Sequence, residues 1–111
     1  LRACALVACR LFLPEPAVMC PVLGAWIDDP VLWLRRVAIL SQLDAKERTD
    51  EARLFGYCER RAHEREFFVR KAIGWALRQY ARTDPGWVRA FVASHEDRLC
   101  GLSRREALKH L

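Results

Sequence analysis

Glycine and proline are scarce in this chain of 111 residues, which has five of each. A turn-rich β-sandwich needs more of both at its tight turns, so the composition favours helices. Histidine is scarcer still, and the three His residues are too scattered to form a local metal site. In the stretch "HEREF" at 63–67, Phe67 stands where a zinc-protease helix has its second His. We therefore expect no metal site.

Paired cysteines are also missing. The five cysteines are an odd number with no C-x-x-C pair, and three of them lie in apolar runs, where Cys behaves as a small core residue. Reduced thiols are expected rather than a disulfide framework. Apolar residues make up 52% of the chain and charged residues 30%, which is typical of a folded, soluble domain rather than of a disordered or membrane-spanning one.

Positive charge is unevenly distributed along the chain. Residues 1–54 carry seven Lys and Arg against seven Asp and Glu, whereas residues 55–111 carry twelve against seven, so the whole excess of +5 lies in the second half. A basic surface of this kind favours an anionic partner, either nucleic acid or an anionic membrane surface. A solvated basic surface without a partner is the plainer alternative.

Apolar periodicity and capping signals predict helices along the whole chain. The Asp-Pro pairs at 29–30 and 84–85 each place an acid at an N-cap and a proline in the first turn. Ser103 and Glu106 have the spacing of a capping box, which predicts that the last helix begins there. The expected helices span about 2–12, 16–28, 30–43, 50–62, 65–82, 85–94 and 103–111.

Two of these helices have similar sequences. The segment "WLRRVA" at 33–38 aligns with "FVRKAI" at 68–73, which places Arg36 opposite Lys71 in successive helix pairs. With short polar connections and no long linker, residues 1–111 are expected to form a single domain. We predict an all-α protein, an α-solenoid of HEAT-like helical pairs (an α-α superhelix) with about seven helices, and a compact orthogonal bundle is the runner-up. Because the chain begins with Leu in the middle of a helical pattern, we expect it to be part of a longer one.

The helix expected at 65–82 has two different faces. At 3.6 residues per turn its apolar side chains collect on one side, which predicts a core stripe of Val69, Ile73, Ala76, Leu77 and Tyr80. The opposite side carries Lys71, Trp75, Arg78 and Arg82. Trp75 either packs against an adjoining repeat or forms an aromatic surface whose cationic flanks bind phosphates.

The helix expected at 30–43 contains an arginine inside its apolar stripe. Arg36 lies on the same side as the apolar residues Leu32, Trp33, Ile39, Leu40 and Leu43. Arg35 falls outside this stripe and is expected to be an ordinary surface charge. Because an unpaired buried charge is strongly destabilising, Arg36 requires either an anionic ligand or a carboxylate from an adjacent helix, such as Asp28, Asp29 or Glu66.

Three long motifs in order resemble the DNA alkylation repair enzymes of the AlkD type, which are bacterial HEAT-repeat DNA glycosylases. The motifs are "WLRRVAILSQL" (33–43), "REFFVRKAIGWALRQYARTDPGWV" (65–88) and "LSRREALKHL" (102–111), and the similarity extends from about Trp26 to Leu111. The resemblance implies a right-handed superhelix whose concave, basic face holds duplex DNA. It also implies hydrolysis of the N-glycosidic bond of cationic N7- or N3-alkylated purines, without a metal or other cofactor, in the bacterial cytoplasm with the nucleoid.

By the same resemblance, Arg36 lies against the DNA near the lesion and Trp75 lines the same cleft, and we assign both to the catalytic site. Lys71, Arg78 and Arg82 complete the expected DNA-binding set. The family's catalytic Asp, four residues after another Trp, has no match in this sequence. We therefore interpret the chain as the C-terminal half of a glycosylase, which retains part of the DNA cleft and has little or no activity by itself.

A second hypothesis is a non-catalytic solenoid that binds DNA or an acidic protein partner, a role that requires no catalytic carboxylate. Association with a membrane is a distant third, because the basic stripe lacks a broad apolar face. Duplex DNA that contains alkylated purines is the partner we expect.

Overall fold

The computed structural model describes residues 16–43 and 45–109. In these residues the chain forms six α-helices, one short 3-10 helix and no strand, so the prediction of an all-α protein is confirmed. None of the described helices is long and apolar enough to cross a membrane. The helix expected at 2–12 lies outside the described residues. The elements are α2 (Pro16–Trp26), α3 (Leu32–Leu40), η1 (Lys46–Arg48), α4 (Glu51–Arg60), α5 (Phe67–Ala81), α6 (Pro85–Ser94) and α7 (Gly101–Ala107).

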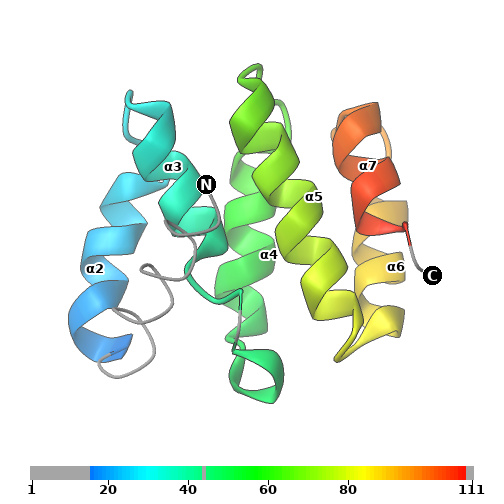
Figure 1. Ribbon diagram of the computed structural model, residues 1–111, viewed down its shortest axis with the longest axis horizontal. Coiled ribbons are helices and arrows are strands. Elements are labelled where there is room, and N and C mark those ends of the chain that lie inside the picture. Colours follow the sequence, from blue (N-terminus) through cyan, green and yellow to red (C-terminus); the bar gives the residue numbers. More distant parts are fainter. Residues whose placement is uncertain (1–15, 44, 110–111) are drawn as a thin grey trace.

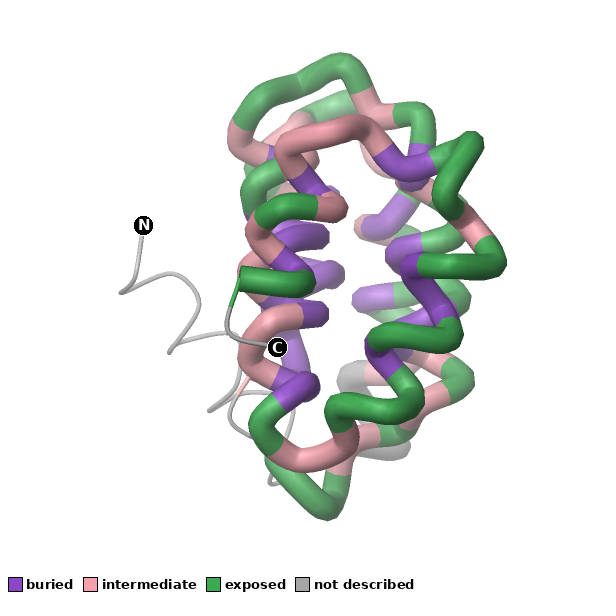
Figure 2. Tube along the Cα trace, turned by 90° about the vertical axis from the view of Figure 1, so that its right-hand side faces the viewer, coloured by how far each residue is buried: buried purple, intermediate pink, exposed green. Residues whose placement is uncertain are grey.

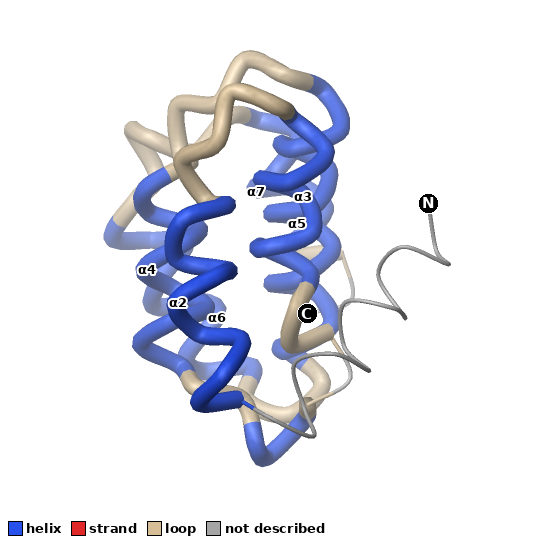
Figure 3. The backbone as a smooth tube through the Cα atoms, turned by 90° about the vertical axis from the view of Figure 1, so that its left-hand side faces the viewer, coloured by secondary structure: helices blue, strands red, loops and turns tan. Residues whose placement is uncertain are grey.

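The helices form two layers. Figure 3 shows α3, α5 and α7 in one layer and α2, α4 and α6 in the other. Successive helices therefore alternate between the layers, as the helical pairs of a solenoid do. In Figure 2 the buried residues of the two layers face one another. Figure 1 shows α5 in the centre of its layer, between α3 and α7, and α5 packs against both of them.

Of the two helix starts predicted at Asp-Pro pairs, the structure has one at the expected position and one two residues later. Asp84 caps α6 by accepting a hydrogen bond from the backbone N–H of Trp87, as expected. The Asp29 carboxylate instead accepts from the N–H of Val31 (2.8 Å), and α3 begins only at Leu32. The first Asp-Pro pair therefore forms a turn ahead of the helix, and the second lies directly at a helix start.

The capping box predicted for the last helix is wrong. The helix α7 begins at Gly101, and its N-cap is Cys100, whose sulfur accepts from the Ser103 N–H. Ser103 lies inside the helix, where its buried hydroxyl donates to the carbonyl oxygen of Arg70 on α5 (2.9 Å). A buried hydroxyl requires a hydrogen-bond partner, and the neighbouring helix supplies this one.

The core stripe predicted on α5 is confirmed. Val69, Ile73 and Leu77 are completely buried, and Ala76 and Tyr80 are nearly so. These side chains belong to a single core to which both layers contribute. Each fully buried large apolar side chain contributes about 1.5–3 kcal/mol to stability, so this stripe fixes which side of α5 faces the core.

The contact between α5 and α7 is very close at Gly74. A Cβ atom at this position would lie 2.5 Å from the Cβ of Glu106 and 3.3 Å from the carbonyl oxygen of Ser103. Both distances are shorter than ordinary van der Waals contact, so α7 can occupy its place only because residue 74 has no side chain. This packing brings Glu106 next to the cationic side of α5.

Arg35 is not the surface charge that we expected from its position on the helical wheel. Its side chain is buried, and its guanidinium donates to both carboxylate oxygens of Glu64 (2.9 and 3.2 Å). It also donates to the carbonyl oxygens of Asp29 and Pro30. The connection between α4 and α5, which carries Glu64, covers this side of α3. Because Glu64 lies 29 residues after Arg35, the apolar pattern of the helix around Arg35 gives no indication of this ion pair.

Adding a side chain at Gly74 should destabilise the fold. The substitution Gly74→Ala gains about 1 kcal/mol of helix propensity, but a clash in a packed interface costs about 1–3 kcal/mol, so we expect a net loss of up to about 2 kcal/mol in the free energy of unfolding. Gly56→Ala in α4 is the matched control, because no atom lies within 4 Å of the added Cβ, and there the change should stabilise. Urea unfolding measures the free energy of unfolding of both variants. A Gly74→Ala protein as stable as Gly56→Ala would contradict the close packing.

Removing the negative charge of Glu64 should also destabilise the protein. Its side chain is 9% exposed and that of Arg35 10%, so Glu64→Gln leaves a buried guanidinium without its counter-ion. We expect the free energy of unfolding to fall by about 3 kcal/mol, as in other buried ion pairs that lose one partner. Glu66→Gln, at an exposed position two residues later, should change stability little. Equal unfolding midpoints for the two variants would show that the buried pair is not stabilising.

Candidate functional site

The layer formed by α3, α5 and α7 contains a hollow of about 430 Å³, which we call the tryptophan hollow. Its lining comes from all three helices and consists of Arg36, Phe67, Phe68, Lys71, Trp75, Arg78 and Glu106. Four of the five predicted site residues are therefore brought together, namely Arg36, Lys71, Trp75 and Arg78. The fifth, Arg82, is the C-cap of α5 and lines a different hollow at the end of that helix.

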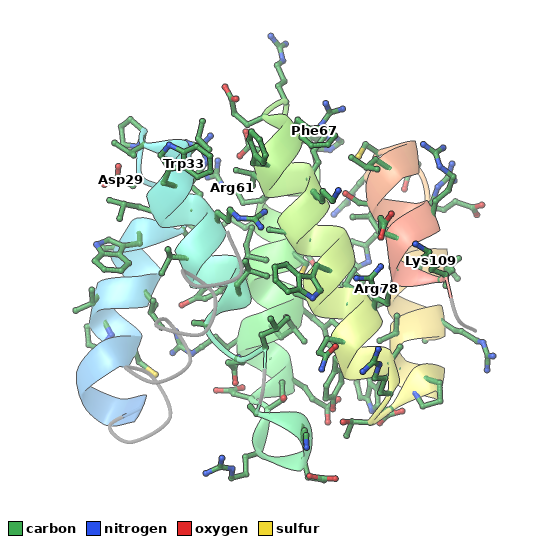
Figure 4. The ribbon with its side chains drawn as sticks, viewed as in Figure 1. Asp29, Trp33, Arg61, Phe67, Arg78 and Lys109 are labelled. Atoms are coloured by element: carbon green, nitrogen blue, oxygen red, sulfur yellow. The ribbon has the colours of Figure 1, made fainter. Side chains whose placement is uncertain are left out.

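Three of these side chains come from one side of α5. Lys71, Trp75 and Arg78 are spaced four and three residues apart, and such residues lie above one another on a helix. The opposite side of α5 is buried in the core, and of these three residues the half-buried Trp75 also packs against that core. Figure 4 shows two labelled side chains of the same helix, Phe67 at its start and Arg78 further along.

Arg36 reaches this hollow from α3. Its side chain is only 4% exposed, and its Nη1 group donates to the carbonyl oxygen of Phe68 in the first turn of α5 (2.6 Å). The guanidinium carbon also lies 5.8 Å from the centre of the Trp75 ring, within the range of a cation–π interaction. Arg36 thus links α3 to the start of α5 and holds its positive charge against the tryptophan.

An aromatic cluster borders the tryptophan hollow where α3 and α5 begin. The Phe68 ring lies 5.2 Å from that of Trp33 and 5.3 Å from that of Phe67, between ring centres. The ammonium group of Lys71 lies 5.7 Å from the Phe67 ring centre. Trp33 and Phe67 are each about half exposed, and Figure 4 shows both at the same end of their layer. In the sequence, this cluster is indicated only by the adjacent residues Phe67 and Phe68 at a helix start, to which we assigned no binding role.

Glu106 is the carboxylate that lines the tryptophan hollow. It accepts a hydrogen bond from Arg78 across the contact between α5 and α7 (2.8 Å), and both side chains are about one quarter exposed. A pair this accessible to water contributes little to stability, so an incoming anion can compete with Glu106 for Arg78. The position of Glu106 in the sequence does not indicate this role, because the same residue also fits a capping box.

The cations and aromatic rings that line the tryptophan hollow suit a ligand in which an anionic group is attached to a planar or apolar group. Three cations and one carboxylate line it, so its net charge is positive. Arginine forms bidentate hydrogen bonds with phosphate oxygens, and aromatic rings contact the bases or sugars next to the phosphates. Among the described residues, no cluster of His, Cys, Asp or Glu could hold a metal ion.

Comparisons with known proteins identify a family and a solved structure to which this chain is similar. A family model described as "DNA alkylation repair enzyme" matches residues 9–111. A solved structure described as "predicted DNA alkylation repair enzyme from Enterococcus faecalis" is 36% identical in sequence, with a TM-score of 0.79 and a match that covers 92% of this chain. The chain spans only 46% of the length of that structure. Proteins with curated functions provide no match.

The resemblance carried by the three sequence motifs is confirmed by these findings. The family model includes all three motifs, and the solved structure has the same helical architecture over nearly the whole of this chain. We conclude that this chain belongs to the DNA alkylation repair enzyme family.

Proposed function

We propose that the tryptophan hollow binds the backbone of duplex DNA and forms part of the site of an alkylpurine DNA glycosylase. The full-length protein would hydrolyse the N-glycosidic bond of cationic N7- or N3-alkylated purines, in the bacterial cytoplasm where the chromosome lies. The observation that carries the proposal is the convergence of Arg36, Lys71 and Arg78 around Trp75 in one hollow.

The chemistry of the substrate matches this lining. A cationic alkylpurine is already a good leaving group, so the enzyme mainly needs to stabilise the positive charge that develops on the sugar. An aromatic face attracts cations, and Trp75 presents the strongest such face of any side chain. The cations around it bind phosphates and fix the position of the strand.

A non-catalytic DNA-binding module is the second candidate. No Trp in this sequence is followed four residues later by Asp, which is the arrangement of the family's catalytic carboxylate. Glu106 lines the tryptophan hollow but is paired with Arg78, and we do not assign it the catalytic role. In this second function the hollow binds DNA and the chain leaves the glycosidic bond intact.

Binding to duplex DNA should weaken steeply with salt. With about three to five phosphate contacts, a plot of log K against log salt concentration should have a slope of about −3 to −4.5. Lys71→Ala should make the slope shallower by about 0.9, because one contact is lost. Arg89→Ala is the control, since Arg89 is exposed on α6 in the other layer. Fluorescence anisotropy with a labelled duplex measures the slopes, and binding that is absent or insensitive to salt would reject the proposal.

Replacing the tryptophan should weaken binding without changing the salt slope. We expect Trp75→Leu to lower affinity for duplex DNA about tenfold, because an aromatic contact is lost and no charge is removed. Trp87→Leu removes a half-exposed tryptophan from α6 and should leave affinity unchanged.

Release of 7-methylguanine from methylated DNA separates the two candidates. We expect this activity from a full-length protein that includes residues 1–111, and we expect Trp75→Leu to reduce it. If such a protein binds DNA through Trp75 and releases no base, the non-catalytic module is the correct function.

A further inference from the structure

A second hollow, of about 410 Å³, lies where α3 and α5 end, and we call it the lysine hollow. Its floor consists of apolar side chains, and its rim carries two cations, Lys46 and Arg82, together with the carboxylate of Glu47. Arg82 is the predicted DNA-binding residue that does not reach the tryptophan hollow. Its place in the lysine hollow, beside a second cation from a different element, calls for a separate explanation.

The backbone at Lys46 has an unusual conformation. Its backbone φ of 52° lies in the left-handed region, which non-glycine residues seldom adopt, and no other described non-glycine residue has a positive φ. The buried Gln42 anchors the far end of the same loop. Its side-chain amide donates to the carbonyl oxygen of Asp50 (3.2 Å) and its Oε1 accepts from the Asp50 N–H (2.7 Å). Gln42 thus links the two sides of the loop that carries Lys46, and a constrained backbone reduces the entropy lost when an anion binds.

Among the described residues, the other polar groups that line the lysine hollow are neutral. Gln79, Thr49 and Thr83 contribute amides and hydroxyls to its lining. Burial, together with a hydrogen bond to Glu51, raises the pKa of Tyr80 to about 12, so its phenol adds no negative charge at neutral pH. In the described lining two cations and one carboxylate stand beside neutral donors, which is a composition suited to a singly charged phosphodiester.

The two hollows follow one another along α5. Arg78 lines the tryptophan hollow and Arg82 the lysine hollow. The step of four residues from Arg78 to Arg82 advances about 6 Å along the helix axis, at 1.5 Å per residue. Phosphates recur along a DNA strand at every nucleotide, about 3.4 Å apart along the axis of B-DNA, so one strand can offer phosphates to both arginines.

We propose that the lysine hollow is a second phosphate-binding site, in which Lys46 and Arg82 bind a phosphodiester of the same DNA strand that contacts the tryptophan hollow. This inference rests on the proposed function and adds a loop residue outside the three family motifs. Glu47 opposes binding at this site and moderates its strength.

Variants of the η1 loop test the site with labelled duplex DNA. Lys46→Gly removes the charge and keeps the fold, because glycine adopts the left-handed backbone without strain. It should make the salt slope shallower by about 0.9, and Arg82→Ala should do the same. Glu47→Gln should tighten binding about twofold or more.

Arg48→Ala is the matched control, since Arg48 is exposed in the same short helix and does not line the hollow. The salt slope of this variant should equal that of the unmodified chain. Equal slopes for Lys46→Gly and Arg48→Ala would overturn the proposal.

Inorganic phosphate provides a test that does not depend on DNA. Added phosphate should shift the backbone amide resonances of Lys46, Arg82 and Thr83, and Lys46→Gly should abolish these shifts. If the chain binds no duplex DNA but phosphate shifts these resonances, the proposed function fails and the anion site stands. If neither DNA nor phosphate perturbs the lysine hollow, the second site is rejected as well. Thermal unfolding of each variant shows that a lost response does not reflect a lost fold.

Discussion

The packing of α5 between α3 and α7 is the constraint on which the other features depend. One side of α5 is buried in the core, its flanks contact the two neighbouring helices, and Gly74 lets α7 approach closely. A helix enclosed in this way has one accessible side left. Lys71, Trp75 and Arg78 occupy that side, so the tryptophan hollow is a direct consequence of how α5 is packed. A different crossing of α5 and α7 would move Glu106 away from Arg78 and change both the shape and the charge of the hollow.

Two adjacent arginines on α3 show how differently a buried guanidinium can be held. Arg35 is paired with the carboxylate of Glu64, which neutralises its charge and joins α3 to the connection before α5. Arg36 donates to a backbone carbonyl and lies near the ring of Trp75. Arg36 lines the tryptophan hollow, whereas Arg35 faces Glu64 and does not line it. Burying a guanidinium requires hydrogen-bond acceptors in either case, and the neighbouring chain segments supply them.

Much of the fold and part of the site could be predicted from local pattern. The apolar stripe of α5, the cap at Asp84 and the all-helical class all follow from spacings within one helix, where side-chain directions are set by the backbone. The same spacing placed Lys71 and Trp75 together. The predictions for Arg35 and for the capping box at Ser103 were wrong, because both residues are satisfied by partners about 30 positions away in the chain. No local periodicity carries information about such partners.

The sequence by itself determined which side of each helix is apolar, where most helices lie, and that a tryptophan stands among cations on α5. These properties depend on residues within a few turns of one another, and helical geometry is the same in every fold. Only the tertiary structure decided that Arg36 meets Trp75, that Glu106 faces Arg78, and that Arg82 shares a hollow with Lys46 instead. These contacts between helices depend on how closely and at what angle the helices cross. The crossing is set by the packing of the whole core and by the absence of a side chain at Gly74.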